Sequence, residues 1–240
     1  MTLKSYDVSH PEYMQILQDG QTLFGCNQDW YRIEWRRRAG CGPVAATNIL
    51  FYLRKKYDES SIPYSNISVE DALDAMNDVF QFVRPKRRGL HTVRKLVKGM
   101  SAFGRRYGLS FRYRYLLVPP QAEKRPGLGE VVRFIMEGLG NDVPVAFLNL
   151  HAGAVEEQLS SWHWVTVVGI TADTALGEEA GNTVCSNTAD TAILRFYDQS
   201  KCLEVELDKW LSTTEKGGGF AYFYKPSQSN TIRYSARSRI

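Results

Sequence analysis

The segment Gly-Cys-Gly-Pro at residues 40–43, followed by a mostly apolar run to Leu53, is the strongest constraint on the fold of this chain. The run predicts a helix starting near Pro43, because proline lacks the N–H that a first helical turn leaves unpaired. Cys41 then lies at the helix start, where free N–H groups and the helix dipole favour a thiolate over a thiol. Cys41 is therefore a candidate nucleophile, although a cysteine beside an apolar helix is more often an inert small hydrophobe.

Gly40 and Gly42 flank this candidate nucleophile. Because they have no side chains, they predict space for a substrate backbone to approach the sulfur. They also allow the turn into the helix to adopt conformations that are costly for other residues.

The composition is that of an ordinary globular protein. The chain has 240 residues, of which 43% are hydrophobic and 23% charged, enough for one substantial core. We expect a single domain over residues 1–240, with a flexible polar tail from residue 226. No apolar run is long enough to cross a bilayer, and the N-terminus lacks a basic region followed by an apolar stretch. The sequence thus predicts a cytoplasmic protein without membrane contact and leaves its oligomeric state open.

The cysteine spacing and the distribution of charge indicate whether metal sites, disulfides or anion-binding sites are expected. The four cysteines form no Cys-x-x-Cys pair, which argues against a structural zinc site and gives little reason to expect disulfides. The net charge is only +4, but basic residues gather at Arg36–Arg38 and Arg84–Arg88. We expect these clusters to be solvated surface, with an acidic ligand as the alternative. Nucleic-acid binding is not expected, because no recognised nucleic-acid motif accompanies them.

Hydrophobic periodicity changes along the chain. After an irregular N-terminal segment, helical spacing predicts helices at 43–56, from Val69, at 92–107 and at 129–138, with Ser68 and Asp71 as a capping box. Alternating or β-branched segments then predict strands at 111–115, 143–150, 162–170, 192–198, 202–207 and 220–224, with a long loop at 171–188. Helices followed by strands indicate an α+β fold with an antiparallel sheet.

His163 is the histidine best placed to serve as a base for Cys41. It is one of four histidines, and it begins an aromatic and β-branched segment that predicts a strand. There the side chain would be fixed in orientation and partly desolvated. A hydrogen-bonded core histidine without a catalytic role is the competing interpretation.

Asp198 ends the predicted strand 192–198. If this strand pairs antiparallel with the strand that begins at His163, Asp198 falls opposite His163 on the same side of the sheet. It could then hold the imidazole toward the sulfur, as the third member of a triad does. An ordinary aspartate in a strand-ending turn is the alternative. Substitutes for the orienting role are Gln199 and, less favoured, Asn149 and Asp208.

Gln28 is the candidate for stabilising an oxyanion. A side-chain amide combined with the backbone N–H of the nucleophile is a common solution when sulfur attacks a carbonyl. Gln28 lies in a polar segment upstream of Cys41, close enough for a loop to bring its amide alongside. Gln21 is the competing choice.

Three short motifs carry a family resemblance. They are Asn-Gln-Asp-Trp at 27–30, Gly-Cys-Gly-Pro-Val-Ala-Ala at 40–46 and His-Trp-Val-Thr-Val-Val-Gly at 163–169. In this order, with Asp198 following, they resemble the papain-like cysteine proteases, and most closely the stand-alone bacterial relatives of the bacteriocin leader-processing, or double-glycine, peptidases. The likeness spans roughly residues 22–225, but it assigns nothing to residues 60–141.

The resemblance implies both a fold and an activity. The fold would be papain-like, with an N-terminal helical half that carries the nucleophile on its core helix and packs on a C-terminal antiparallel sheet. The activity would be hydrolysis of a peptide or amide bond in a peptide or protein substrate through a thioester on Cys41. Cys41, His163 and Asp198 would form the triad and Gln28 the oxyanion site, with no metal or cofactor.

Two other functions remain open at this level. The same triad could serve a deamidase or an acyltransferase, since only the acyl acceptor differs. Alternatively, the chain could be a catalytically silent papain-like module that binds a peptide or, through its basic clusters, an anion.

Overall fold

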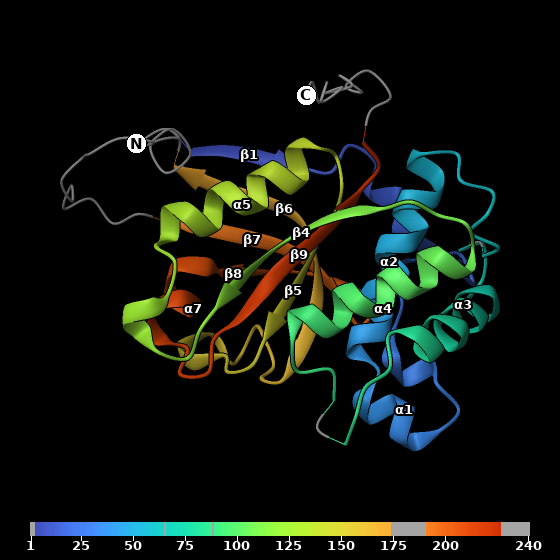
Figure 1. The fold of residues 1–240 in the computed structure, drawn as a ribbon, viewed down its shortest axis with the longest axis horizontal. Helices are drawn as coiled ribbons and strands as arrows, with labels where there is room; N and C mark the ends of the chain where they lie inside the picture. Colours follow the sequence, from blue (N-terminus) through green and yellow to red (C-terminus); the bar gives the residue numbers. More distant parts are fainter. Residues whose placement is uncertain (1–2, 65, 88, 174–190, 227–240) are drawn as a thin grey trace, which may run out of the picture.

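The computed structural model describes residues 3–64, 66–87, 89–173 and 191–226, which form a mixed α+β structure. In Figure 1 helices α1 to α4 gather on the right, while most of the sheet lies to the left with α5 and α7. All but the first residue of the predicted tail from residue 226, and most of the predicted loop 171–188, lie outside the described residues.

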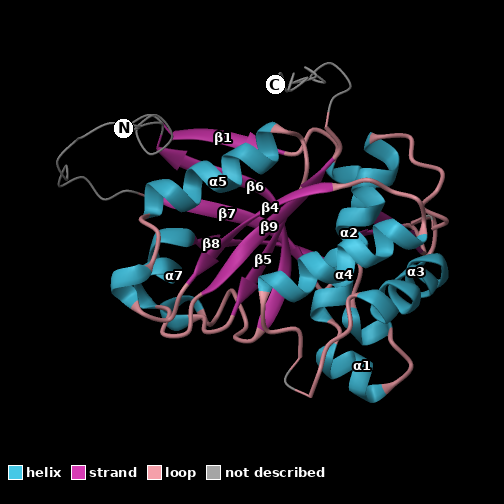
Figure 2. Ribbon diagram, in the orientation of Figure 1, coloured by secondary structure: helices cyan, strands magenta, loops and turns pink. Residues whose placement is uncertain are grey.

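A seven-stranded sheet forms the larger part of the structure (Figure 2). Its strand order is β4-β9-β5-β6-β7-β8, with β1 also paired to β6, and every pairing in it is antiparallel. The strands are β1 (Leu3–Asp7), β4 (Arg112–Val118), β5 (Val145–Asn149), β6 (His163–Asp173), β7 (Ala192–Asp198), β8 (Lys201–Glu206) and β9 (Gly218–Tyr224). A separate hairpin joins β2 (Gln15–Gln18) to β3 (Gln21–Phe24). The prediction of an α+β fold with an antiparallel sheet is therefore confirmed.

The α-helices of the described residues are α1 (Glu34–Ala39), α2 (Cys41–Lys56), α3 (Val69–Phe82), α4 (Val93–Arg106), α5 (Leu128–Gly140) and α7 (Leu207–Thr213). Short 3-10 turns occur at η1 (Pro11–Met14), η2 (Gln28–Trp30), η3 (Ala122–Lys124) and η4 (Gly153–Val155). Helices α2 to α5 match the four predicted helices, and Ser68 caps α3 by accepting the N–H of Asp71 at 3.1 Å. Within the described residues, no helix combines the length and apolar character needed to cross a lipid bilayer.

Helix α2 is the buried centre of the helical side. Every residue from Cys41 to Leu53 is buried, which explains why this segment is apolar on all sides instead of amphipathic. Ile49 and Leu53 are completely buried in the core cluster that also contains Trp164 of β6. Full burial of one such aliphatic side chain contributes about 1.5–3 kcal/mol. The packing of α2 on β6 thus fixes where the first residue of the helix lies relative to the sheet.

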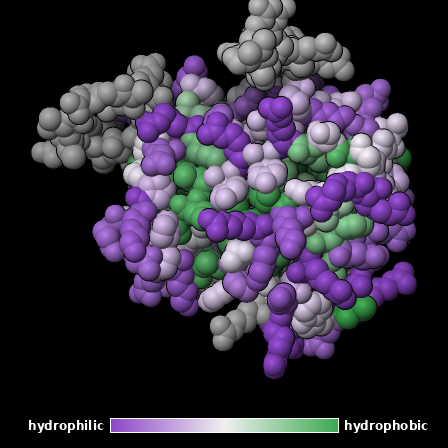
Figure 3. All heavy atoms as spheres, in the orientation of Figure 1, coloured by the Kyte–Doolittle hydropathy of each residue, from purple (hydrophilic) through white to green (hydrophobic). Residues whose placement is uncertain are grey.

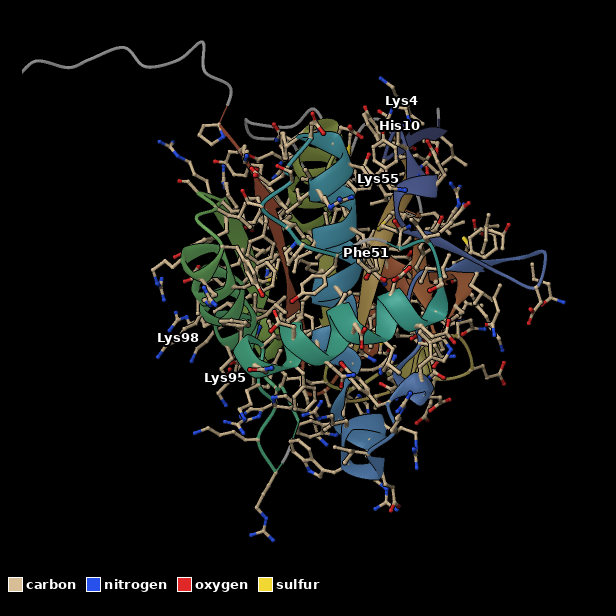
Figure 4. The ribbon with its side chains drawn as sticks, turned by 90° about the vertical axis from the view of Figure 1, so that its right-hand side faces the viewer. Lys4, His10, Phe51, Lys55, Lys95 and Lys98 are labelled. Carbon is tan, nitrogen blue, oxygen red and sulfur yellow. The ribbon has the colours of Figure 1, made fainter. Side chains whose placement is uncertain are left out.

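The surface has the opposite character. On the face shown in Figure 3, hydrophilic side chains cover most of the rim and hydrophobic ones show between them. The turned view in Figure 4 places Phe51 of α2 in the interior, where it is 2% exposed, and Lys95 and Lys98 of α4 at the periphery.

Asn48 ties α2 to two other segments. Its Oδ1 accepts the backbone N–H of Cys26 at 2.9 Å, and its Nδ2 donates to Thr166 Oγ1 of β6 at 3.2 Å. A Cβ added at Gly25 would lie 2.8 Å from Asn48 Nδ2, and Gly25 has a φ of +79°, so glycine is required in this close turn. Through Asn48, the segment that precedes Gln28 is held against the same helix that carries Cys41.

The N-terminal segment was predicted to be irregular, and this was wrong. It contains β1, the β2–β3 hairpin and α1. Strand β1 is almost entirely exposed, so it has no alternation of apolar residues, and it forms because its backbone pairs with the second half of β6. For the same reason β6 continues to Asp173, beyond the predicted strand end at residue 170. Strand β1 and the end of β6 depend on each other although they lie far apart in the sequence, which local patterns do not reveal.

Candidate active site

Cys41 is the first residue of α2, and its N-terminal neighbour Gly40 serves both as the end of α1 and as the start of α2. The Cys41 residue is 8% exposed and lines a pocket of about 570 Å³. The predicted helix start is therefore correct to within two residues. The sulfur lies at a helix N-terminus and is reachable from solvent through the pocket.

His163 and Asp198 are in direct contact. The imidazole Nε2–H donates to Asp198 Oδ1 at 2.7 Å, and the side chains of the two residues are only 9% and 16% exposed. The side chain of Cys41 is close enough to His163 to contribute to a raised pKa of the imidazole. Because Nε2 is engaged by the carboxylate, Nδ1 is the ring nitrogen left for the sulfur. The structure thus brings together three of the four predicted site residues, with His163 hydrogen-bonded to Asp198 and electrostatically coupled to Cys41.

The predicted strand pairing was wrong in its register. Strands β6 and β7 pair with Thr166 opposite Tyr197, and continuing this register places Asp198 opposite Val165, two residues beyond His163. An offset of two residues preserves the face of the sheet, whereas an offset of one would reverse it. Asp198 consequently reaches His163 diagonally, which is within range for these side chains.

The electrostatic surroundings of His163 have opposing effects. Burial is the largest and lowers its pKa, because a buried imidazolium loses hydration. The hydrogen bond and the charge of Asp198, together with the interaction with the Cys41 side chain, outweigh burial and raise the pKa of His163 to about 10. At neutral pH the site therefore holds a protonated imidazole beside the sulfur, an arrangement suited to pairing with a thiolate.

Gln28 begins η2, which lies between the two halves of this site. On one side, Tyr31 follows η2 and packs on Gly40, where an added Cβ would lie 2.5 Å from the tyrosine ring. On the other side, Asn27 Nδ2 donates to the backbone oxygen of Gln199, next to Asp198, at 3.4 Å. The Gln28 side chain is half-buried in this position. Its role at an oxyanion stays a prediction.

The expectation that Gly40 and Gly42 open space for a substrate was wrong. A Cβ at Gly42 would lie 2.6 Å from Leu90, and one at Gly40 would lie 2.5 Å from Tyr31 and from the backbone oxygen of Arg36. Gly40 also has ordinary helical angles, with φ −84° and ψ −5°. The glycines are needed because the chain itself packs closely on both sides of Cys41.

The substitute residues have other partners. Asn149 donates to the backbone oxygen of Ser160 at 2.7 Å and accepts from Trp210 Nε1 at 2.8 Å, so it anchors α7. Asp208 accepts the backbone N–H of Ala192 at 3.3 Å. Gln21 is exposed and pairs with Gln18 at the turn of the β2–β3 hairpin. Gln199 lies in the tight β7–β8 turn with a φ of +46° and contacts Asn27 through its backbone.

The other histidines also have local partners. His10 pairs with Glu12 at 2.9 Å, and His151 Nδ1 accepts the backbone N–H of Glu215 at 3.0 Å. His91 lies 3.3 Å from Lys95 Nζ.

The sequence did not predict which residues would line a pocket beside Cys41, although Arg38 and Arg87 belong to the two basic clusters for which an acidic ligand was the alternative. The pocket beside Cys41 is also lined by Trp35, Arg38, Ala39, Arg87, Gly89 and Trp162. The sequence did signal Trp162, which directly precedes His163. It has a φ of +59°, an unusual conformation for a tryptophan that costs about 1–3 kcal/mol and tends to occur at functional sites. Its ring is half exposed, so it forms one wall of the pocket.

The basic clusters are only partly solvated surface, as the structure shows. Arg36 donates to Asn77 Oδ1 at 2.5 Å, and Arg37 donates to the backbone oxygen of Tyr31 at 2.9 Å. Arg38 instead points outward, and its side chain is 77% exposed. Arg36 and Arg37 are thus partly buried and hydrogen-bonded to the protein, whereas Arg38, Arg84 and Arg87 are exposed, as predicted.

Metal-binding and thiol groups are few in the described residues. No cluster of three or more His, Cys, Asp or Glu side chains that could hold a metal ion occurs among residues 3–64, 66–87, 89–173 and 191–226. Cys26 is completely buried, and this burial raises the pKa of its thiol. Cys202 is exposed and has a free thiol, and partial burial of its sulfur raises the pKa of that group. Cys185 lies outside the described residues.

Comparison with known proteins gives no family assignment: no protein-family model, curated protein or solved structure matches this chain.

The raised pKa of His163 predicts a stability that depends on pH. The folded protein keeps a proton that the unfolded chain releases near pH 6.5, so the stabilisation is complete below pH 6.5 and lost as the pH rises to about 10. We expect the free energy of unfolding to fall less between pH 6 and pH 10 in His163→Gln than in the wild type. The difference should be at least about 1.4 kcal/mol, the worth of one pKa unit. Urea unfolding at several pH values measures it, and parallel losses in both proteins would contradict the assignment.

Proposed function

We propose that this protein is a cysteine peptidase that hydrolyses a peptide or amide bond through a thioester on Cys41. The observation that carries the proposal is the grouping of Cys41, His163 and Asp198: a cysteine at a helix start raises the pKa of an imidazole that is hydrogen-bonded to a largely buried carboxylate. The adjacent pocket gives a substrate access to the sulfur. A buried histidine with so strongly raised a pKa, next to a thiol in a pocket, is a recognised sign of a functional site.

The first half of the reaction is acylation. The Cys41 sulfur attacks the carbonyl carbon and forms a C–S bond, while the carbonyl electrons move to oxygen. The backbone N–H of Cys41 and the Gln28 amide stabilise this oxyanion. His163 then donates its Nδ1 proton to the amide nitrogen, and the C–N bond breaks. The amine leaves, and the acyl group remains on Cys41 as a thioester.

Deacylation reverses these roles. The now neutral His163 takes a proton from water, whose oxygen attacks the thioester carbon. The C–S bond breaks and returns its electrons to sulfur, which restores the thiolate and the imidazolium. Asp198 holds the ring orientation throughout and stabilises its positive form.

We further propose that the chain is a papain-like protease. The support is the chain order Gln28, Cys41, His163 and Asp198, with the cysteine on an early buried helix and the other two on strands of a later antiparallel sheet. The short motifs around Asn27, Gly40 and His163 support the same assignment.

Activation of Cys41 predicts selective alkylation. At neutral pH we expect iodoacetamide to modify Cys41 at least about tenfold faster than Cys26, Cys185 or Cys202, because the thiolate is the reactive form. Peptide mapping by mass spectrometry measures the four rates. His163→Ala should abolish the preference, whereas the control His10→Ala, on a histidine paired with Glu12, should retain it. Equal rates at all four cysteines in the wild type would refute the activated thiolate.

The reaction products distinguish a peptidase from a deamidase or an acyltransferase. A peptide library incubated with the protein gives cleaved chains if water attacks a backbone thioester. Side-chain deamidation gives a gain of about one dalton, and an added amine gives adducts if the enzyme transfers acyl groups. Cleavage lost in Cys41→Ala supports the proposal, and either of the other products assigns the triad to a deamidase or an acyltransferase.

If Gln28 stabilises the oxyanion, its substitution should slow peptide cleavage without slowing the alkylation of Cys41. Gln28→Ala should lower peptide cleavage by about 10²–10³-fold, the usual effect of losing one oxyanion donor. The same variant should keep the wild-type iodoacetamide rate at Cys41, because displacement at a saturated carbon forms no oxyanion. Gln21→Ala is the matched control and should leave both values unchanged. Loss of cleavage in Gln21→Ala alone would move the role to the competing glutamine.

A further inference from the structure

The pocket beside Cys41 has a pronounced chemical bias. Two arginines from separate segments line it, Arg38 from α1 and Arg87 from the turn that precedes α4, together with the indoles of Trp35 and Trp162. Among the described residues that line it, none carries a carboxylate. Outside this wall, Lys216 Nζ lies 5.1 Å from the centre of the Trp162 ring and adds positive charge. The pocket therefore favours an anionic group.

The guanidinium of Arg38 is available to a ligand. Its partner within the chain is Glu34, at 2.6 Å one helical turn away, and the two side chains are 77% and 67% exposed. An exposed pair of this kind contributes only about 0.3–0.5 kcal/mol. Since a guanidinium has five N–H donors, Arg38 can bind a further carboxylate at little cost. Arg87 is exposed as well.

Two neighbouring arginines, Arg36 and Arg37, are held against the protein and do not line the pocket. Arg36 stacks on Phe80 at 4.7 Å and bonds Asn77, and Arg37 bonds the Tyr31 backbone. These two side chains do not extend the pocket into a basic stripe that could follow a nucleic-acid backbone. The indole walls lower the local polarity, which strengthens charge recognition next to the sulfur.

We propose that the substrate carries an acidic side chain within a residue or two of the bond that Cys41 attacks, and that Arg38 and Arg87 bind its carboxylate. This inference rests on the proposed peptidase function and gives its substrate class: a peptide segment with aspartate or glutamate beside the scissile bond. The aliphatic part of that side chain packs between Trp35 and Trp162. Arg38 and Arg87 are thus specificity residues that touch substrate and take no part in the bond chemistry.

The test compares two alkylating reagents at Cys41. Iodoacetate and iodoacetamide share the same reacting carbon and leaving group, so the ratio of their rate constants cancels the reactivity of the sulfur and reports the charge of the pocket. We expect Arg38→Gln and Arg87→Gln each to lower the iodoacetate-to-iodoacetamide ratio at least about threefold. Arg105→Gln, at the far end of α4, is the matched control and should keep the wild-type ratio.

Paired peptides provide the second measurement. For a cleaved library peptide with glutamate beside the scissile bond, the glutamine version should have a higher KM in the wild type, and Arg38→Gln should remove the difference. Unchanged reagent ratios and equal KM values would overturn the acidic specificity while leaving the peptidase intact. A different result would show that the proposed peptidase function is wrong: iodoacetamide would then modify Cys41 no faster than the other cysteines. Protection of Cys41 by an oligothymidine, but not by an oligoglutamate peptide, would also overturn the proposal in favour of nucleic-acid binding.

Discussion

The hydrogen bond between His163 Nε2 and Asp198 Oδ1 joins the start of β6 to the end of β7 at 2.7 Å, and the chemistry of the site depends on it. It fixes the imidazole so that its other nitrogen serves Cys41, and it offsets the cost of burying a positive charge. Burial by itself lowers the pKa of His163, and this carboxylate opposes that effect. The alternation of the sheet makes the contact possible, because a two-residue offset leaves both side chains on one face.

The position of the sulfur depends on the packing of α2. The helix is buried along its first thirteen residues, and Asn48 ties it both to β6 and to the turn that leads to Gln28. Gly40 and Gly42 let Tyr31 and Leu90 pack against the helix start without a clash. The two halves of the candidate site therefore meet through the packing of the core, and the loops around them supply the pocket walls.

Elements with strong local patterns were predictable from the sequence. Helices α2 to α5 follow apolar spacing, and β7 follows a run of apolar and β-branched residues, so the bounds of α2, α4, α5 and β7 and the start of α3 were predicted to within a few residues. Strand β1 and the extension of β6 were missed because each exists only through pairing with the other. Cys41, His163 and Asp198 were predicted as site residues from their types and order, and the structure places them together. The register of Asp198 and the pocket arginines required the three-dimensional structure, because neither follows from local sequence.

The most direct test of a nucleophilic Cys41 is capture of its acyl-enzyme. A peptide library is mixed with the wild type, quenched in acid within the first turnovers, and the protein is digested and analysed by mass spectrometry. If Cys41 is the nucleophile, the peptide that contains it carries an acyl group that hydroxylamine removes, as it does from a thioester, and Cys41→Ala carries none. Peptide cleavage that continues in Cys41→Ala, or an acyl group found on another residue, would contradict the account.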